Sequence, residues 1–277
     1  RGANEDDYLV ATLPLDGGGL IAAIADGMGG AAGGAEASRT ALRALGATML
    51  DSDKIPAGGV DSVSARMSSG FQSANVRVLE SADAVPVLRD MGTTMTALWL
   101  GPSGGLLGHT GDTRLYRLRG DDYEVLTADH AVKEGESLLT RCIGGGQLVC
   151  DADYEEVEVQ VGDRFVLCTD GVWNVVSSRD FVELAFCRGA QETAEKLVKS
   201  ALDAGGPDNA TVVVVDMASS GTSGAKEVDL PRHERPGARS LWPASVSLRP
   251  SVWSCLVLFV AVCLLIYSAL KYFINDR

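Results

Sequence analysis

The sequence has 277 residues, of which 46% are apolar, so the chain is long enough to bury a substantial core. Its formal net charge of −13 at pH 7 argues against a nucleic-acid-binding protein, which would need a basic face, and means that an anionic substrate must be met by local positive charge. The six cysteines form no C-x-x-C pair, so we expect free thiols in a reducing compartment. Because the chain opens with Arg1 and not with Met, we expect a fragment or a processed form in which an upstream strand is missing.

Hydrophobic periodicity predicts groups of strands that alternate with pairs of helices. In chain order, the predicted strands are 8–14, 21–26, 93–100, 106–109, 114–118, 124–127, 154–161, 164–169 and 210–217. The predicted helices are 35–50, 60–81, 180–187 and 191–203, and the glycine-rich stretch 128–150 is expected to be irregular. This order favours an α+β domain over residues 1–217, with helices outside packed antiparallel sheets.

The C-terminal quarter of the chain differs from the rest. Residues 218–250 are rich in Ser, Gly, Pro and Arg and are predicted to be a flexible linker. Residues 252–270 contain no charge, so we expect one transmembrane helix at 251–272, followed by a short tail at 273–277; a buried core helix is the alternative. Arginines gather before the span, which predicts a single-pass protein of the inner membrane with its domain in the cytoplasm.

One stretch of the chain combines a buried strand with an unusual ending. The apolar run that starts at Ile21 ends in Asp26, and three of the next four residues are glycines. Asp26 offers a hard oxygen ligand, and the Gly27 carbonyl can approach a cation because no side chain stands in the way. The alternative is an ordinary glycine-rich turn before a helix.

Several acids share a pattern with Asp26, an Asp beside Gly or Asn at the end of a strand or in a loop after an apolar run. They are Asp112, Asp170 and Asp208, and Glu5 and Asp6 lie in a further acidic stretch near the N-terminus. Oxygen ligands without His or Cys point to Mg²⁺ or Mn²⁺ and away from zinc. So many carboxylates in one place would repel one another unless cations neutralised them, whereas each acid taken alone could be a turn residue.

The ordered set of these motifs resembles the metal-dependent serine/threonine protein phosphatases of type 2C, known as the PPM family, and its bacterial branch in particular. The motifs are Arg1-x-x-Asn-Glu-Asp6, Asp26-Gly-Met-Gly-Gly30, Gly111-Asp-Thr-Arg114, Leu126-Thr-x-Asp-His130, Asp170-Gly171 and Pro207-Asp-Asn209. The resemblance covers residues 1 to about 217. It implies a central sandwich of two antiparallel β-sheets flanked by helices.

The resemblance also implies a set of ligands for two Mn²⁺ or Mg²⁺ ions and for a third, weaker one. Asp26 would bridge two metals, with the Gly27 carbonyl on one of them, and Asp170 and Asp208 would complete the ligands of the first metal. Glu5 would act through water at the second metal. Asp112 would hold the third metal together with Asp170.

Four further residues receive supporting or substrate roles from the resemblance. Arg1 would clamp the substrate phosphate, Asp6 and Asn209 would support the metal ligands, and Arg114 would pair with a carboxylate of the site. The implied reaction is attack on phosphorus by a hydroxide held between the two metals, without a phosphoenzyme. Arg141 is also marked by its motif, and we expect it either near the substrate or in a structural role.

The sequence departs from the family pattern in two ways. Met28 stands where many members carry the His that protonates the leaving group, and Met cannot do this. His109 and His130 are the histidines available in the domain, although packing or turn stabilisation is the commoner role of such residues. The stretch between His130 and Thr140 is also short for the family's flap, with Ser137 as a substitute ligand in it.

Three functions fit the sequence. The first is a Mn²⁺- or Mg²⁺-dependent phosphatase of phosphoserine and phosphothreonine proteins, anchored in the membrane and opposing a bacterial Ser/Thr kinase. The second is a catalytically inactive module that binds phosphoproteins, which the missing His and short flap would allow. The third is a phosphatase of one dedicated regulator. No nucleic-acid partner is expected.

Overall fold

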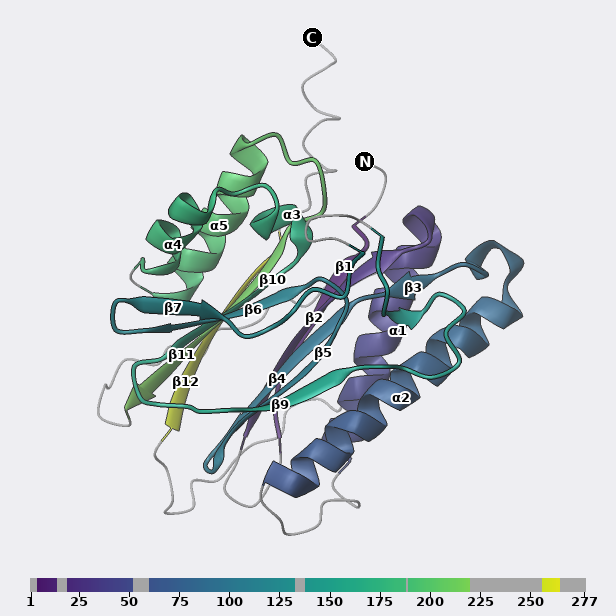
Figure 1. Cartoon of the computed structure of the whole chain (residues 1–277), viewed down its shortest axis with the longest axis horizontal. Helices are drawn as coiled ribbons and strands as arrows, with labels where there is room; N and C mark the ends of the chain where they lie inside the picture. The colour runs from purple at the N-terminus through teal and green to yellow at the C-terminus, as the bar shows by residue number, and fades with distance from the viewer. Residues whose placement is uncertain are drawn as a thin grey trace, which may run out of the picture.

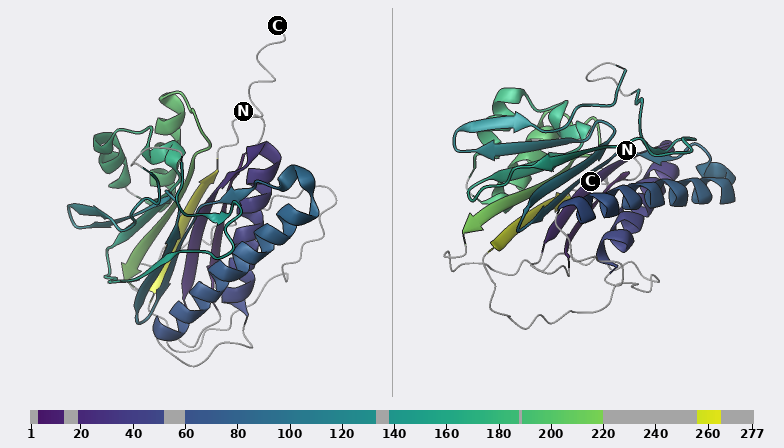
Figure 2. Two further views of the ribbon diagram at one scale, coloured as in Figure 1. Left: turned by 45° about the vertical axis from the view of Figure 1, so that its right-hand side comes forward. Right: turned by 60° about the horizontal axis from the view of Figure 1, so that its bottom comes forward.

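The computed structural model describes residues 4–13, 19–51, 60–132, 138–187, 189–219 and 256–264. Two antiparallel sheets pack face to face, and helices cover the outer face of each one (Figure 1). Figure 2 shows the same layers from two other directions, with α1 and α2 on one side of the sheets and α4 and α5 on the other. The predicted sandwich flanked by helices is therefore confirmed.

The first sheet has the strand order β8-β3-β2-β4-β5-β9, and β1 also pairs with β2. Its strands are β1 (Asp6–Thr12), β2 (Leu20–Met28), β3 (Gly92–Thr93), β4 (Met95–Gly101), β5 (Gly104–Thr110), β8 (Ile143–Gly144) and β9 (Asp153–Val157). The second sheet has the order β12-β11-β10-β6-β7. Its strands are β6 (Arg114–Arg119), β7 (Asp122–Val125), β10 (Arg164–Cys168), β11 (Thr211–Ser219) and β12 (Leu256–Leu264).

The helices form the two outer layers. They are α1 (Gly30–Leu50), α2 (Val60–Ala84), the 3₁₀ turn η2 (Pro86–Leu88), α3 (Asp170–Trp173), α4 (Ser178–Ala185) and α5 (Ala190–Asp203). Helix α1 begins five residues before the predicted start. Gly33 and Gly34, which favour a turn in the sequence, lie inside the first turns of the helix. The two-residue strands β3 and β8 and the one-turn helix α3 were not predicted, since elements so short leave no periodic pattern.

Strand β2 explains why an uninterrupted apolar run ends at the site. Alternate side chains of a strand face opposite sides of a sheet. Ile21 and Ala23 pack in the core beneath α1 and α2, whereas Ala22 and Ile24 pack in the core between the two sheets. Both faces of β2 are buried, so the strand carries its last residues, including Asp26, to the edge of the sandwich in a fixed orientation.

The C-terminal segment is extended where the sequence predicted a helix. Residues 256–264 pair with β11 in an antiparallel ladder, from Leu264 opposite Thr211 to Leu256 opposite Ser219. The run is rich in Val, Leu and Phe, which suit a strand as well as a membrane helix, and the edge of β11 offers unpaired backbone groups. Among the described residues, no helix is both long and apolar enough to cross a bilayer. The remainder of the predicted span and most of the predicted linker lie outside the described residues.

We expect replacement of Phe71 by Ala to lower the free energy of unfolding by about 3–5 kcal/mol, because a fully buried aromatic ring is lost and leaves a cavity. Phe71 is 0% exposed on α2 and meets Tyr154 edge-on, with ring centroids 5.6 Å apart. Chemical denaturation measures the change. Val76→Ala on the same helix is the matched control, since Val76 is 49% exposed and its truncation should change stability by less than about 0.5 kcal/mol. Equal effects of the two substitutions would contradict the described core.

Candidate metal centre

The first two acids of the site lie on neighbouring strands. Asp6 opens β1 and stands directly opposite Asp26 near the end of β2. The Gly27 amide donates to the Glu5 carbonyl at 3.2 Å, and the Glu5 amide donates to Asn209 Oδ1 at 3.0 Å. Residues that are 204 positions apart in the chain are thereby held at one end of the sandwich.

Asp6 ties the two sheets together. Its Oδ2 accepts hydrogen bonds from Thr211 Oγ1 at 2.7 Å and from Thr169 Oγ1 at 3.0 Å. The Thr211 amide in turn donates to Thr169 Oγ1 at 3.1 Å. Because Thr169 immediately precedes Asp170, the same contacts place Asp170 beside the β1–β2 pair.

Glycines allow the surrounding backbones to approach closely. A Cβ on Gly27 would collide with the Gly34 carbonyl, and a Cβ on Gly34 would collide with Glu5 Oε2. A Cβ on Gly171 would collide with the Asn209 carbonyl and lie 3.2 Å from Asp208 Cβ. These contacts bring Asp170-Gly171 against Asp208-Asn209, and they set the first turn of α1 against Glu5.

Asp112 follows β5 in a loop that is held by aromatic and cationic groups. Its carbonyl accepts from Trp173 Nε1 at 3.0 Å. The Arg114 guanidinium lies 3.6 Å above the Trp173 ring and donates twice to Asp129, at 2.9 and 2.7 Å. Arg114 thus pairs with Asp129 of the neighbouring motif, which is not among the predicted site acids, so its predicted pairing with a carboxylate of the site stays a prediction.

Charge repulsion shows that the acids share one place. Burial raises the pKa of Asp26 well above its usual range, and the charges of Asp6, Asp170, Asp112 and Asp208 raise it further. Asp26 thus feels four other carboxylates drawn from both sheets. Such an arrangement is unfavourable for bare anions and favours positive charge among them.

Two of the neighbouring carboxyls show the same effect. The pKa of Asp6 is raised to about 7, first by burial and then by Asp170 and Asp208 against the hydrogen bonds from its two threonines. The pKa of Asp112 is also raised to about 7, by burial and by the charge of Asp170. Without a compensating cation, these groups hold their protons in the folded chain up to neutral pH.

The donor set fits a hard divalent cation. The converging groups are carboxylates and the carbonyl of a glycine, and oxygen ligands of this kind suit Mg²⁺ and Mn²⁺. Asp6 Oδ1 is buried and accepts no hydrogen bond from the described residues. Among those residues no three Asp, Glu, His or Cys side chains already form a metal-ligand group, so the individual ligand assignments stay predictions.

The structure places every predicted site residue except Arg1 and Ser137, which lie outside the described residues. Hydrogen bonds, strand register and mutual charge join Glu5, Asp6, Asp26, Gly27, Asp112, Asp170, Asp208 and Asn209. Arg114 lies next to this group through Trp173. Arg141 contacts Asp151 and Asp153, each at 2.9 Å.

The histidines have structural partners on both ring nitrogens. His109 is 1% exposed, with Thr96 at 2.9 Å from Nδ1 and the Ala128 carbonyl at 3.1 Å from Nε2. Burial and the neighbouring His130 lower the pKa of His109 to about 4, so its ring is neutral. His130 accepts from the Gly111 amide and contacts Asp153.

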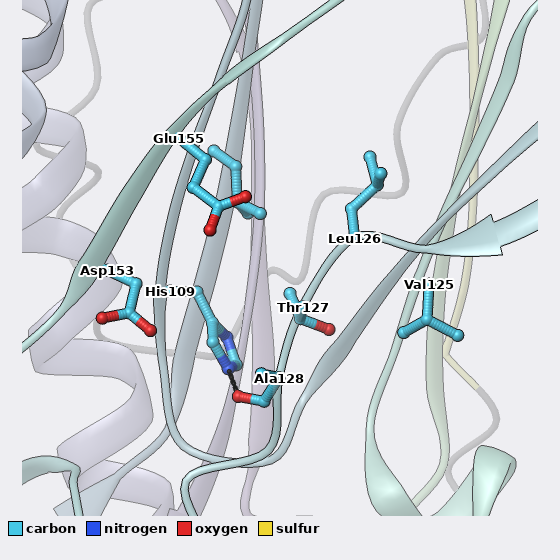
Figure 3. A pocket seen from close by; sticks show the side chains of 8 residues that line it. His109, Val125, Leu126, Thr127, Ala128, Asp153 and Glu155 are labelled. Atoms are coloured by element: carbon cyan, nitrogen blue, oxygen red, sulfur yellow. Dashed lines mark hydrogen bonds between the residues drawn. The ribbon is translucent and has the colours of Figure 1, made fainter.

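A hollow of about 230 Å³ lies away from the acid cluster, between β5, β9 and the segment after β7. Figure 3 shows the His109 ring on the wall of this hollow, directed at the Ala128 carbonyl. Asp153 and Glu155 lie on the other side of His109 from Ala128. The lining contains none of Asp6, Asp26, Asp170 and Asp208. The chemistry of the site therefore resides at the sheet edge and not in this hollow.

Some residues of the centre were not predicted from the sequence. Thr169 and Thr211 donate hydrogen bonds to the Asp6 carboxylate, and Trp173 donates one to the Asp112 carbonyl. Gly34 leaves room for the Glu5 carboxylate, because it has no side chain. Thr169 immediately precedes Asp170 and Thr211 lies two residues after Asn209, so their positions beside the acids were an available signal. Their partners depend on how the sheets meet, which no local pattern encodes.

Residues 1–204 match the sequence profile of protein phosphatase 2C, so the chain belongs to this family. It is 34% identical over 233 residues to the serine/threonine protein phosphatase PstP of Mycobacterium tuberculosis, a match that covers 78% of this chain and 42% of PstP. The chain thus spans less than half of that relative. It is 29% identical over 214 residues to the serine/threonine phosphatase stp of Listeria innocua, covering 71% of this chain and 84% of stp.

Solved structures give the same family. The catalytic domain of PstP in complex with two manganese ions superposes with a TM-score of 0.64 at 31% identity, covering 77% of this chain and 91% of that one. Glu5, Asp6, Asp26, Asp112 and Asp170 lie within the matched family region, residues 1–204, whereas Asp208 lies just beyond its end.

In a chelator, we expect the domain to lose stability as the pH rises from about 4 to about 7. The pKa of Asp6 and of Asp112 rises from 3.8 to about 7 on folding, so the folded chain holds protons that the unfolded chain releases, and deprotonation in this range favours unfolding. Thermal unfolding at pH 5 and pH 8 measures this. Asp6→Asn keeps the acceptor for the threonines but cannot ionise, so it should raise the midpoint at pH 8 far more than at pH 5. Equal shifts at both pH values would contradict the raised pKa of Asp6.

Proposed function

We propose that the chain is a Mn²⁺- or Mg²⁺-dependent phosphatase that hydrolyses phosphoserine and phosphothreonine on proteins. The observation that carries this proposal is the convergence of five buried or half-buried aspartates at one end of the sandwich. Membership of the protein phosphatase 2C family supports it, as do relatives named serine/threonine phosphatases.

The proposed ligands are those that the family resemblance implies, and the contacts at the sheet edge support them. Asp26 would lie between two cations, with the Gly27 carbonyl, Asp170 and Asp208 on one side and Glu5 on the other. Asp112 and Asp170 would hold a third, weaker ion. When bound, the cations supply the charge that lowers the pKa of water and neutralises the phosphate oxygens.

The chain's own residues orient the acids of this centre, and they leave solvent as the proton donor for the leaving group. Thr169 and Thr211 hold the Asp6 carboxylate, and Asn209 holds the backbone of Glu5, so the acids cannot swing apart to relieve their repulsion. Met28 carries no proton to donate. Since both ring nitrogens of His109 and of His130 have partners, the leaving oxygen takes its proton from solvent in this proposal.

An inactive phosphoprotein-binding module remains the contrasting function. It would gain nothing from a carboxylate cluster that destabilises the fold at neutral pH. Binding of two Mn²⁺ ions by this protein would therefore favour the enzyme over the binding module. As substrates we propose phosphoproteins produced by a bacterial Ser/Thr kinase, with one dedicated regulator as the narrower case.

With Mn²⁺ present, we expect hydrolysis of a phosphothreonine peptide, measured as released phosphate. Asp26→Asn and Asp170→Asn should each lower the rate by roughly 100-fold or more, since even outer-shell partners of metal ligands are worth 10- to 100-fold. Asp203→Asn is the control, because Asp203 contacts Lys199 on the exposed face of α5 and its loss should leave the rate unchanged. An inert wild-type protein, or unchanged rates in both site variants, would contradict the proposed function.

We further propose that residues 251–272 anchor the protein in the inner membrane, with the catalytic domain in the cytoplasm. The support is the 19-residue run without a charge at 252–270 and the arginines before it. Insertion requires residues 256–264 to leave the edge of β11. The linker at 218–250 would give the domain reach over membrane-bound substrates.

For the anchor, we expect the full chain to float with membranes on a density gradient. The double variant Val260→Arg with Val262→Arg should stay in the soluble fraction, since each arginine at the centre of a membrane helix costs about 2.5–3.5 kcal/mol. Ser251→Arg introduces the same residue at the border of the span and should still float. A wild-type chain in the soluble fraction would contradict the anchor.

A further inference from the structure

His130 forms two hydrogen bonds with the backbone of Gly111, the residue before Asp112. The His130 amide donates to the Gly111 carbonyl at 2.7 Å, and the Gly111 amide donates to His130 Nδ1 at 3.2 Å. Gly111 has φ +109°, and a Cβ there would collide with Thr94. Glycine adopts this φ without a steric penalty, so the chain can turn at Gly111, and His130 is the residue that holds the backbone of this turn.

The hydrogen bond to Nδ1 fixes the tautomer of His130. Since Nδ1 accepts from the Gly111 amide, the ring proton resides on Nε2 and is donated to Asp153 Oδ2 at 2.9 Å. Arg141 Nη1 also lies 3.3 Å from Nε2, but a guanidinium can only donate, and its hydrogen bond goes to Asp153 Oδ1 at 2.9 Å. The ring is thus oriented by β9 on one side, and it supports the Asp112 loop on the other.

The Asp112 loop needs this support because its carboxylate is repelled. Asp112 is 7% exposed and faces the negative charges of Asp170 and Asp129. Trp173 holds the Asp112 carbonyl at 3.0 Å. The backbone of the loop is therefore held at two successive residues. The His130 ring holds the Gly111 amide, and the Trp173 ring holds the Asp112 carbonyl.

We propose that His130 is a positioning residue that keeps Asp112 in place for the weaker third cation. The inference rests on the proposed function, because it assigns a use to Asp112 in that centre. His130 contacts the backbone of Gly111 and not the cation, the substrate or the reacting atoms. The contact that positions the loop is the hydrogen bond that His130 Nδ1 accepts from the Gly111 amide.

Two neutral amides test this assignment. In His130→Asn the amide oxygen takes the place of Nδ1 and can accept from Gly111, whereas in His130→Gln the oxygen extends toward the place of Nε2. We expect His130→Gln to raise the Mn²⁺ concentration at half-saturation of the weak site by about tenfold, the value of one lost hydrogen bond, and His130→Asn to stay near wild type. His109→Asn removes the neighbouring ring, whose centroid lies 4.8 Å from that of His130 with the planes tilted by 39°, without touching Gly111, and should leave the manganese titration unchanged.

The full-length protein is titrated with Mn²⁺ by calorimetry and, separately, by hydrolysis of p-nitrophenyl phosphate; circular dichroism confirms that each variant is folded. Weakening by Gln and rescue by Asn support the proposal. Equal titrations in all variants, or equal weakening by Asn and Gln, overturn it. If the wild type binds Mn²⁺ but hydrolyses nothing, the proposed function fails, while the calorimetric comparison still decides the role of His130.

Discussion

Repulsion between buried carboxylates is the constraint on which this structure depends. Burial and mutual repulsion raise the pKa of Asp6, Asp26 and Asp112, and Asp170 and Asp208 contribute to the negative potential around them. A chain that only needed to fold would place apolar side chains at this sheet edge. The arrangement is stable in ionised form only with positive charge among the oxygens, so cation binding and the stability of this end of the sandwich are linked.

The scaffold resists the repulsion with contacts between segments that are distant in sequence. Hydrogen bonds from Thr169 and Thr211 fix Asp6 between the two sheets. Glycines at 27, 34 and 171 let backbones approach where any side chain would collide. The α1 side and the α5 side of the molecule therefore meet at the acids, and relaxation of one carboxylate would disturb both sheets.

The sequence predicted the layers and the acids but not the contacts that orient them. Asp26 and Asp170 stand out because each comes at the end of an apolar strand and precedes Gly, and Asp208 because it precedes Asn just before the apolar strand β11, which are local patterns. The bonds from Thr211 to Asp6 and from His130 to Gly111 join residues 205 and 19 positions apart, and only the tertiary fold brings them together. Residues 256–264 form a strand where the sequence predicted a helix, for another reason. An apolar segment of this length suits a helix or a strand, and its surroundings decide which of the two it forms.

The most direct test of the account is anomalous diffraction at the manganese absorption edge from crystals of the protein grown with Mn²⁺. The account predicts two strong peaks on either side of the Asp26 carboxylate, one of them beside the Gly27 carbonyl. A map without peaks there, at a manganese concentration that supports hydrolysis, would show that the clustered aspartates do not hold the metals and would contradict the central claim.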